Sequence, residues 1–504
     1  MPAKTIMVQG TASSVGKSVL VTALCRIFLQ DGFRVAPFKA QNMALNSFVT
    51  REGGEIGRAQ AVQAEASRIE PSVHMNPVLL KPEAEAKSQV IVLGKVVGSL
   101  KASEYYQHTS HLLDVIRESL DRLRSEYDIV VIEGAGSPAE VNLKDREIVN
   151  MRVARLAGSP VLLVGDIDRG GVFASIVGTL ELLNPEERDL IRGLVINKFR
   201  GDLNLLRPGL DFLEQKTGKP VCGVVPYFRN ISIAQEDSVF LDERRNTSAT
   251  SGLDVAVIRL PHISNYDDFD PLEALGCNVR YITSAAELGN PDIIILPGTK
   301  STIADLVHLQ ECGLSGDIVQ KAKTGTPVVG ICGGYQMLGR IIRDPYGIES
   351  SRESAPGLGL LDCETVFQAD KTTTQVKAKV AADAGLLSGM KGMVVSGYEI
   401  HTGQTTTRGG VPPFEVVETP QGRTSYYDGN IDGDCHVLGS YLHGLFHNPE
   451  FTRAFLSQLR RLKDLPEDNT LPKLRDNQYD ELADIVRQSV DISRIYSIME
   501  MKHG

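Results

Sequence analysis

The chain has 504 residues, more than one hydrophobic core usually supports, so two or three domains are expected. Its net charge of -10 argues against nucleic acid or an anionic membrane as the main partner. Seven scattered cysteines without a C-x-x-C pair fit a reducing compartment and no structural zinc site. The sequence shows no basic-then-apolar signal and no apolar run near the ~20 residues that span a bilayer. We therefore expect a cytoplasmic enzyme.

The first half of the chain alternates between short aliphatic runs and stretches with helical periodicity. The runs that predict buried parallel strands cover 5–10, 34–40, 127–136, 160–168, 191–199 and 219–227. Helical spacing of apolar residues occurs at 18–32 and 109–127. This alternation is typical of a doubly wound α/β domain, which binds ligands at the carboxyl ends of its strands, and we assign the domain to residues 1–240.

A polar segment, 241–252, follows this half and is predicted to be a linker. A second alternating series comes after it. Its aliphatic runs lie within 253–261, 278–283, 291–301, 326–339 and 435–446. The sequence thus predicts a second α/β domain over 253–449, followed by a charged, helix-prone tail over 450–504.

The first candidate site is a glycine-rich loop between a predicted strand and a predicted helix. Gly10 and Gly16 enclose five residues, where the usual phosphate-binding loop has four, and Lys17 and Ser18 follow. A helix N-terminus offers free N–H groups and a positive dipole end to a phosphate. Lys17 would reach the β- and γ-phosphates, and Ser18 would ligate Mg²⁺. The alternative is a glycine turn with an exposed lysine. The predicted nucleotide-binding residues are Thr11, Ser13, Ser14, Val15, Gly16, Lys17 and Ser18.

The extra residue in this loop resembles the variant loop of dethiobiotin synthetase-like enzymes. Those enzymes use ATP to activate a carboxylate as an acyl phosphate. The resemblance implies that the chain binds ATP for the same kind of chemistry.

Acidic residues at other strand ends are candidates for binding metal or substrate. Glu133 follows four aliphatic residues, and with Ser18 it is expected to hold Mg²⁺, unless it is an ordinary loop carboxylate. Asp166 and Asp168 end the next run in the same way, and metal, substrate or their own turn are all open as partners. No permanent cofactor is expected.

The stretch "FKAQNMALNS" follows another predicted strand and is rich in amide side chains. Lys39, Gln41, Asn42 and Asn46 form a cluster of hydrogen-bonding groups, which indicates either a substrate-binding loop or a polar surface loop. Gln41 and Asn42, with Asp166 and Asp168, are the candidate substrate-binding residues.

The second half contains a candidate nucleophile in "TPVVGICGGYQMLGRII". A strand over 328–331, Cys332 at a turn and a helix over 335–342 form a nucleophile elbow, whose strained bend needs small neighbours. A helix N-terminus stabilises a thiolate. The Gly333 N–H is expected to bind a developing oxyanion, and Gly298 in "ILPGTKS" is the candidate for the second donor. The alternative for Cys332 is a buried small residue.

A thiolate nucleophile needs a base, and His443 in "VLGSYLHGLF" is the first candidate. It follows an aliphatic strand of the same predicted domain, which would place it at the same sheet edge as Cys332. His401 in "GYEIHTG" is the rival, although a structural or ammonia-path role fits it better.

The elbow and the histidine segment together resemble the class I, triad-type glutamine amidotransferase domain, which releases ammonia from glutamine through a cysteinyl thioester. Most members carry His-x-Glu. Here Gly444 and Leu445 follow His443, so the third member of the triad is missing. This departure is similar to the cobyrinic-acid amidase branch, whose site resembles a Cys–His dyad.

The order of motifs over residues 4–448 resembles the cobyric acid synthase family, glutamine-hydrolysing corrinoid amidases. The segments that carry the resemblance are "VQGTASSVGKS", "KAQNMALNS", "EGAGSPAEVNL", "VGDIDRGGVFAS", "NKFRGD", "LPGTKST" and "GYEIHTG". The resemblance implies two sites, with glutamine, ATP and a corrinoid as substrates. It also implies the reaction, amidation of the b, d, e and g propionates of adenosylcobyrinic acid a,c-diamide to adenosylcobyric acid, forming ADP and phosphate, in cobalamin biosynthesis. Nothing in the sequence defines the oligomeric state.

Three alternatives stay open at this point. Cobyrinic acid a,c-diamide synthase has the same domains and chemistry, but a Gly-Pro-Asp-type loop would be expected in place of "KAQNMALNS". A partition-type P-loop ATPase has no use for the elbow cysteine. A glutaminase-fused nucleotide synthetase such as CTP synthase would be expected to keep His-x-Glu.

Overall fold

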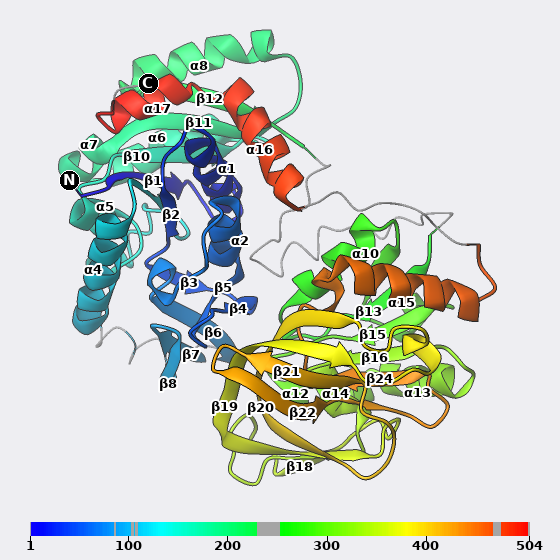
Figure 1. Cartoon of the computed structure of the whole chain (residues 1–504). Coiled ribbons are helices and arrows are strands. Elements are labelled where there is room, and N and C mark those ends of the chain that lie inside the picture. Colours follow the sequence, from blue (N-terminus) through cyan, green and yellow to red (C-terminus); the bar gives the residue numbers. More distant parts are fainter. Residues whose placement is uncertain are drawn as a thin grey trace. The chain divides into compact units, whose positions relative to one another are not determined.

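The computed structural model of the chain describes residues 2–84, 87–101, 105, 109–228, 252–466 and 475–501. These residues form two compact units (Figure 1). The first unit contains the described parts of 1–44, 55–234 and 473–504, and the second contains 45–54 and the described part of 235–472. The predicted linker over 241–252 lies, apart from Gly252, outside the described residues.

The first unit is built around a parallel six-stranded sheet with the order β12-β11-β10-β1-β9-β2. Its strands coincide with the six aliphatic runs of the first half, so the predicted doubly wound fold is confirmed. The strands are β1 (Lys4–Gly10), β2 (Val35–Phe38), β9 (Ile129–Glu133), β10 (Val161–Asp166), β11 (Ile191–Phe199) and β12 (Val221–Pro226).

Helices cover both faces of this sheet, which is why its strands are apolar on both sides. In β1, Met7 packs in one hydrophobic cluster, while Ile6 and Val8 pack in another. The helices are α1 (Lys17–Gln30), α2 (Arg58–Ala66), α4 (Thr109–Glu126), α5 (Met151–Ala157), α6 (Val172–Leu182), α7 (Pro185–Leu190), α8 (Leu203–Thr217), α16 (Arg475–Ser489) and α17 (Ile492–Ile498), with 3₁₀ turns at η1 (Val73–Met75) and η3 (Lys144–Arg146).

A smaller sheet in the first unit was not predicted. Its order is β3-β6-β7-β8, and its strands mix polar with apolar residues, so they lack the long aliphatic runs of strands buried on both faces. They are β3 (Gln41–Met43), β6 (Val78–Ala84), β7 (Lys87–Val92) and β8 (Lys95–Lys101); the three-residue strand β5 (Glu55–Gly57) is also in this unit.

The second unit contains a six-stranded sheet with the order β14-β13-β15-β16-β24-β23, parallel except for β23. Its strands are β13 (Asp254–Ile258), β14 (Asn278–Ile282), β15 (Ile293–Leu296), β16 (Val328–Ile331), β23 (Asn430–Ile431) and β24 (Val437–Ser440). Its helices are η4 (Tyr266–Phe269), α10 (Asp270–Ala274), α11 (Ala285–Leu288), α12 (Thr302–Glu311), α13 (Leu314–Lys323), α14 (Gly333–Leu338), η5 (Gly385–Leu387), η6 (Leu445–His447) and α15 (Pro449–Leu462). A second α/β domain is therefore confirmed.

A largely antiparallel sheet, also not predicted, adds long strands to this unit. Its strands are β17 (Ile341–Arg343), β18 (Ser354–Pro356), β19 (Cys363–Val380), β20 (Val394–Thr407), β21 (Phe414–Thr419) and β22 (Gly422–Asp428). The strand β4 (Ser47–Val49) contacts β19 and β20, so a piece of the N-terminal chain belongs here.

The predicted helical tail over 450–504 is divided between the two units. The helix α15 belongs to the second unit, whereas α16 and α17 belong to the first, where α16 packs beside α1 (Figure 1). Arg26 of α1 is 1% exposed and pairs with Asp476 and Asp480 of α16 at 2.9 and 2.7 Å. No helix among the described residues is both long and apolar enough to cross a membrane.

Candidate functional site

The glycine-rich loop of the first unit adopts a conformation that needs its glycine. Gly16 has φ of 99°, a left-handed value, and a Cβ there would lie 2.0 Å from Nδ2 of Asn197. Ser14 also has a positive φ, 58°. The helix α1 begins immediately after Gly16, at Lys17, so the loop meets a helix N-terminus as the sequence predicted.

Side chains hold the carbonyls of this loop. Asn197 Nδ2 donates to the Val15 carbonyl at 2.8 Å, and Lys198 Nζ donates to the Ser14 carbonyl at 2.8 Å. Lys17 Nζ donates to the carbonyls of Ala12 and Gly136 at 2.9 and 3.2 Å. Because these bonds use carbonyl oxygens, they fix the loop without occupying its N–H groups, which are the donors that a phosphate would need.

Glu133 is the centre of a buried polar cluster beside the loop. Its Oε1 accepts hydrogen bonds from Ser18 Oγ at 2.8 Å and Lys39 Nζ at 3.0 Å, and its Oε2 accepts one from Gln63 Nε2 at 2.5 Å. Burial raises the pKa of this carboxyl, but the charge of Lys39 and the three hydrogen bonds outweigh burial and hold the pKa below its ordinary value. Glu133 is therefore an ionised carboxylate that contacts Ser18.

This cluster fits a magnesium ion shared with a nucleotide. Hydroxyl and carboxylate oxygens are the ligands that Mg²⁺ prefers, and protein sites for it use one or two such groups plus substrate phosphates. In the described part of the chain, no group of three or more His, Cys, Asp or Glu side chains is arranged so that it could hold a metal ion.

The four candidate substrate-binding residues have ordinary polar partners. Asn42 Nδ2 donates to Gln60 Oε1 at 3.0 Å, and the Tyr105 hydroxyl donates to Gln41 Oε1. Asp166, at the end of β10, pairs with Lys198 at 2.8 Å.

Asp168 pairs with Arg200 at 3.0 Å, and Arg200 lies over the ring of Tyr227. Substrate binding by Gln41, Asn42, Asp166 and Asp168 stays a prediction.

In the second unit, Cys332 lies at the predicted elbow between β16 and α14. Its backbone is strained, with φ of 52° and ψ of −109°, and its N–H donates to the Ser440 carbonyl at 2.8 Å. The neighbours must be small: a Cβ at Gly334 would lie 2.0 Å from the Leu296 carbonyl oxygen. The predicted helix over 335–342 is wrong at both ends, because α14 runs from Gly333 to Leu338 and the chain then turns into β17.

The loop that contains the candidate oxyanion donor Gly298 lies close to Gly333 and to His443. A Cβ at Gly333 would lie 3.2 Å from the Thr299 N atom, and a Cβ at Gly298 would lie 2.7 Å from Cε1 of His443. The loop containing Gly298 and Thr299 is fixed by Asp305, whose carboxylate accepts from Thr299 Oγ1 at 2.5 Å. Its backbone can therefore approach the elbow closely.

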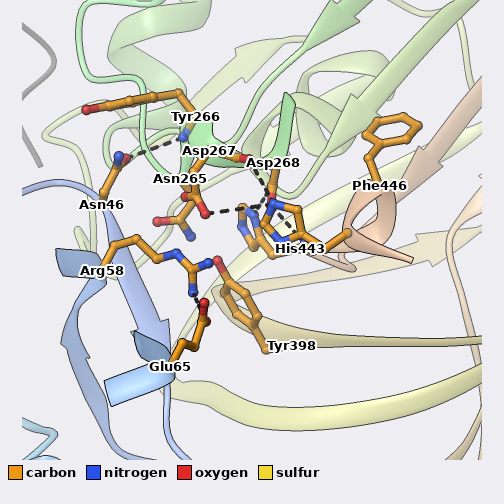
Figure 2. A network of polar contacts seen from close by, with 12 residues as sticks. Asn46, Arg58, Glu65, Asn265, Tyr266, Asp267, Asp268, Tyr398, His443 and Phe446 are labelled. Atoms are coloured by element: carbon orange, nitrogen blue, oxygen red, sulfur yellow. Dashed lines mark hydrogen bonds and ion pairs between the residues drawn. The ribbon is translucent and has the colours of Figure 1, made fainter. Parts of the chain in front are cut away.

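His443 makes a contact that the sequence did not predict. Its Nδ1 donates to Oδ2 of Asp268 at 2.7 Å, both side chains are 1% exposed, and Oδ1 of Asp268 accepts from the Gly444 N–H at 2.8 Å (Figure 2). The sequence lacks the third member of a triad after His443, but the structure places a carboxylate from η4, far from His443 in sequence, against this histidine. The segment "NYDDF" gave no signal, since adjacent acidic residues are common on loops.

The charges around His443 favour its protonated form. Burial lowers its pKa, but the Asp268 carboxylate, Cys332 and their hydrogen bonds outweigh burial and raise the pKa to about 10. A pKa that high fits an imidazolium ion-paired with the Asp268 carboxylate.

His401 has a different environment. Burial lowers its pKa to about 4, its Nδ1 lies 2.8 Å from the Gly403 carbonyl, and its ring stacks on Tyr441. It is a neutral, packed histidine, which favours His443 as the base. Cys332 Sγ donates to the carbonyl of Ile400, which neighbours His401, at 3.5 Å.

Two family models match the chain, one in each half. Residues 6–239 match a CobQ/CobB/MinD/ParA nucleotide binding domain, and residues 254–451 match a CobB/CobQ-like glutamine amidotransferase domain. The first match contains the glycine-rich loop and Glu133. The second contains Cys332, His443 and Asp268.

Curated relatives match over the full length. A protein named cobyric acid synthase from Dehalococcoides mccartyi (strain CBDB1) is 59% identical over 497 residues, covering 99% of this chain and 99% of that protein. Proteins with the same name from Sorangium cellulosum and Thermoanaerobacter sp. are 54% and 52% identical, covering 97% and 98% of this chain and 98% of each relative.

Solved structures are similar only in part. The structure of PurLQS from Thermotoga maritima covers 42% of this chain and 97% of its own, at 18% identity and a TM-score of 0.32. The signal recognition particle receptor FtsY from Elizabethkingia anophelis in complex with GDP covers 45% and 58%, at 17% identity and a TM-score of 0.27.

Proposed function

The chain belongs to the cobyric acid synthase family, and from this premise we propose that it is a glutamine-dependent amidoligase of cobalamin biosynthesis. Its proposed reaction is amidation of the b, d, e and g propionates of adenosylcobyrinic acid a,c-diamide, giving adenosylcobyric acid, ADP and phosphate. The observation that carries the proposal is the 59% identity to a cobyric acid synthase over 99% of both chains. Under this proposal the first unit is the amidoligase unit and the second is the glutaminase unit.

In the glutaminase unit, the Cys332 thiolate attacks the side-chain amide carbon of glutamine. The carbonyl π electrons move to oxygen, and the Gly333 N–H and the backbone at Gly298 and Thr299 bind the resulting oxyanion. His443 then gives its proton to the leaving nitrogen, the C–N bond breaks, and ammonia and a thioester form.

Hydrolysis of the thioester completes the cycle. His443, now neutral, takes a proton from water as the water oxygen attacks the thioester carbon, and the C–S bond breaks to release glutamate and the thiolate. Asp268 accepts from Nδ1, so it fixes the ring with Nε2 available for the proton transfers and stabilises the imidazolium.

In the amidoligase unit, the residues of the glycine-rich loop would hold ATP, with Lys17 close to its phosphates. A carboxylate oxygen of the corrinoid attacks the γ-phosphorus, the bond to ADP breaks, and an acyl phosphate forms. This step is needed because a carboxylate is a poor acyl donor, whereas phosphate is a good leaving group.

Ammonia completes the amide in the same unit. Its nitrogen attacks the acyl carbon, phosphate leaves, and the nitrogen loses a proton. Ser18 and Glu133 would hold Mg²⁺, which when bound supplies charge neutralisation for the phosphate oxygens. The buried ammonium of Lys39, 3.0 Å from Glu133, adds a second positive charge beside the same carboxylate.

The test is amide formation on adenosylcobyrinic acid a,c-diamide with Mg-ATP, with glutamine or ammonium chloride as the nitrogen source. Wild type should use both, and Cys332→Ala should use only ammonium chloride, each amide changing the product mass by one carboxylate-to-amide step. If Cys332→Ala uses glutamine as well as wild type does, the glutaminase assignment is wrong. If neither nitrogen source gives product while ATP is hydrolysed, the corrinoid substrate is wrong.

A further inference from the structure

Residues 45–54 are part of the glutaminase unit, although the chain on both sides of them belongs to the amidoligase unit. The segment contains β4 and is deeply packed: Asn46, Ser47, Val49 and Thr50 are each 0% exposed. So complete a burial of polar residues requires specific partners. Thr50 finds its partners inside the segment, at Gly53 and Gly54, whereas the partners of Asn46 and Ser47 lie around the catalytic residues of the glutaminase unit.

The first group of contacts is with the turn that carries Asp268. Tyr266 N–H donates to Oδ1 of Asn46 at 3.3 Å (Figure 2). Ser47 N–H donates to Oδ1 of Asn265 at 2.9 Å. Asn265 precedes η4, and its carbonyl accepts from the Asp268 N–H at 3.1 Å. The two reciprocal amide contacts therefore fix the start of the turn from which Asp268 reaches His443.

The second group of contacts is with the strand beside His443. The Tyr398 hydroxyl donates to the Ser47 carbonyl at 3.3 Å, and the rings of Phe48 and Tyr398 lie 5.8 Å apart. Tyr398 stacks on His443, with ring centroids 5.2 Å apart and planes at 15°. The two residues also exchange backbone hydrogen bonds, at 2.9 and 3.1 Å.

A third contact leads toward the nucleophile. Val49 forms a small apolar cluster with Tyr398 and Ile400, and the Ile400 carbonyl accepts from the Cys332 thiol. Three successive residues of the segment, Ser47 to Val49, thus pack against groups that touch His443 or Cys332.

We propose that residues 45–54 are a positioning segment of the glutaminase site, with the amides of Asn46 and Asn265 as positioning residues for the Asp268–His443 pair. The proposal rests on the proposed glutaminase function. The proposal gives the N-terminal half of the chain a role in glutamine hydrolysis. This role comes from residues 45–54 and not from the glycine-rich loop or the parallel sheet of that half. Geometry is the reason: an error of about 1 Å in a catalytic group can cost about 10²-fold in rate.

The main test uses Asn265, because its backbone allows a clean substitution. Its φ is 53°, a left-handed value that glycine adopts more easily than asparagine, so Asn265→Gly removes the acceptor for Ser47 without straining η4. Asn265→Asp keeps an acceptor oxygen and tolerates the same φ, so it is the conservative rescue variant.

We expect Asn265→Gly to lower kcat for glutamine hydrolysis by about 10- to 100-fold, with KM nearly unchanged, since the catalytic pair is misplaced and no glutamine contact is removed. The pH profile of kcat/KM should also shift, because the pKa of His443 depends on Asp268. Amide formation from ammonium chloride should stay within about twofold of wild type, and Asn265→Asp should recover most of the glutamine-dependent rate.

Asn46→Ala, which removes the second amide contact, should act in the same direction as Asn265→Gly. Gln458→Ala is the matched control, because Gln458 Nε2 donates to the Gly385 carbonyl at 2.9 Å elsewhere in the same unit. The proposal is overturned if both segment variants hydrolyse glutamine as fast as Gln458→Ala. It is equally overturned if they lose glutamine- and ammonia-dependent activity together with thermal stability, since that marks a general folding defect.

This test is separable from the proposed function. Glutamate release is measured without reference to the corrinoid, so a wrong acceptor substrate would leave the comparison of segment variants intact.

Discussion

Asp268 and His443 form a buried, hydrogen-bonded pair in which Oδ2 and Nδ1 are 2.7 Å apart. The carboxylate is held at its other oxygen by the Gly444 N–H, so its orientation is fixed by the backbone next to the histidine that it serves. Under the proposed function, Asp268 joins Cys332 and His443 in the glutaminase site, with the three residues contributed by separate parts of the chain.

Asp268→Asn is expected to lower glutamine hydrolysis by about 10²- to 10⁴-fold, the range typical of a lost acid–base contribution. The substitution preserves size but removes the negative charge that raises the pKa of His443. Glutamate release at several pH values is the measurement. Ammonia-dependent amide formation is the internal control, and equal loss of both activities would contradict a role confined to the glutaminase unit.

Glu133→Gln should impair amide formation from either nitrogen source, by about 10²-fold or more, while glutamine hydrolysis is less affected. The variant removes an anionic oxygen that Ser18 contacts and leaves the buried Lys39 ammonium without its counter-charge. Calorimetric binding of ATP in the presence and absence of Mg²⁺ gives an independent measurement. Unchanged dependence of ATP binding on Mg²⁺ would argue against the proposed metal ligand.

A buried carboxyl pair predicts a pH-dependent stability of the glutaminase unit. Burial and the nearby charge of Asp428 raise the pKa of Glu399 from 4.5 to about 7, although a hydrogen bond from Tyr426 acts in the opposite direction. Burial also raises the pKa of Asp428, to about 6. Through Glu399, the folded state binds more protons than the unfolded state between about pH 4.5 and 7. Stability present below pH 4.5 is lost as the pH rises through that window.

Glu399→Gln should remove up to about 3 kcal/mol of this pH dependence, because a glutamine does not titrate yet can still accept from Tyr426. Chemical denaturation of both proteins between pH 4.5 and 8, followed by circular dichroism because the chain has no tryptophan, is the measurement. Glu418→Gln, a half-exposed carboxylate that pairs with Lys377 on the antiparallel sheet, is the matched control. Parallel stability curves for wild type and Glu399→Gln would refute the prediction.

The ion pairs between α1 and α16 predict that removing the partners of Arg26 lowers the free energy of unfolding of the amidoligase unit. Its guanidinium is 1% exposed, whereas the carboxylates of Asp476 and Asp480 are 45% and 43% exposed. The double variant Asp476→Asn, Asp480→Asn should destabilise the amidoligase unit by about 1–3 kcal/mol, less than for a fully buried pair because water reaches the carboxylates. Adding Arg26→Met should recover part of the loss; a triple variant as unstable as the double would mean that unpaired charge is not the cause.

The parallel sheets and the elbow could be predicted because their signals are local. A run of aliphatic residues marks a strand buried on both faces, and Cys332 between a strand and glycines marks a turn with no room for side chains. Both of these patterns depend on a few consecutive residues. His443 was found in the same way, from the strand that precedes it.

Asp268 could not be found by such reasoning, because what defines it is a contact across 175 positions of sequence. Asn46 is a related case. Its amide is one of several in "KAQNMALNS", yet it bonds to Tyr266 in the glutaminase unit, while Asn42, four residues earlier, bonds to Gln60 in the amidoligase unit. The sequence shows Asn42 and Asn46 as similar amides of one polar loop. Only the three-dimensional structure shows that they belong to different units.

The return of α16 and α17 to the amidoligase unit sets an order on synthesis. Leu482, Val486, Ile495 and Tyr496 pack in the same hydrophobic cluster as Phe28 of α1. On the ribosome, the unit that is begun first is thus completed last, after the whole glutaminase unit has emerged. Until then an apolar face of α1 is left open to chaperones or aggregation. A chain truncated before α16 would carry a finished glutaminase unit beside an unfinished amidoligase unit.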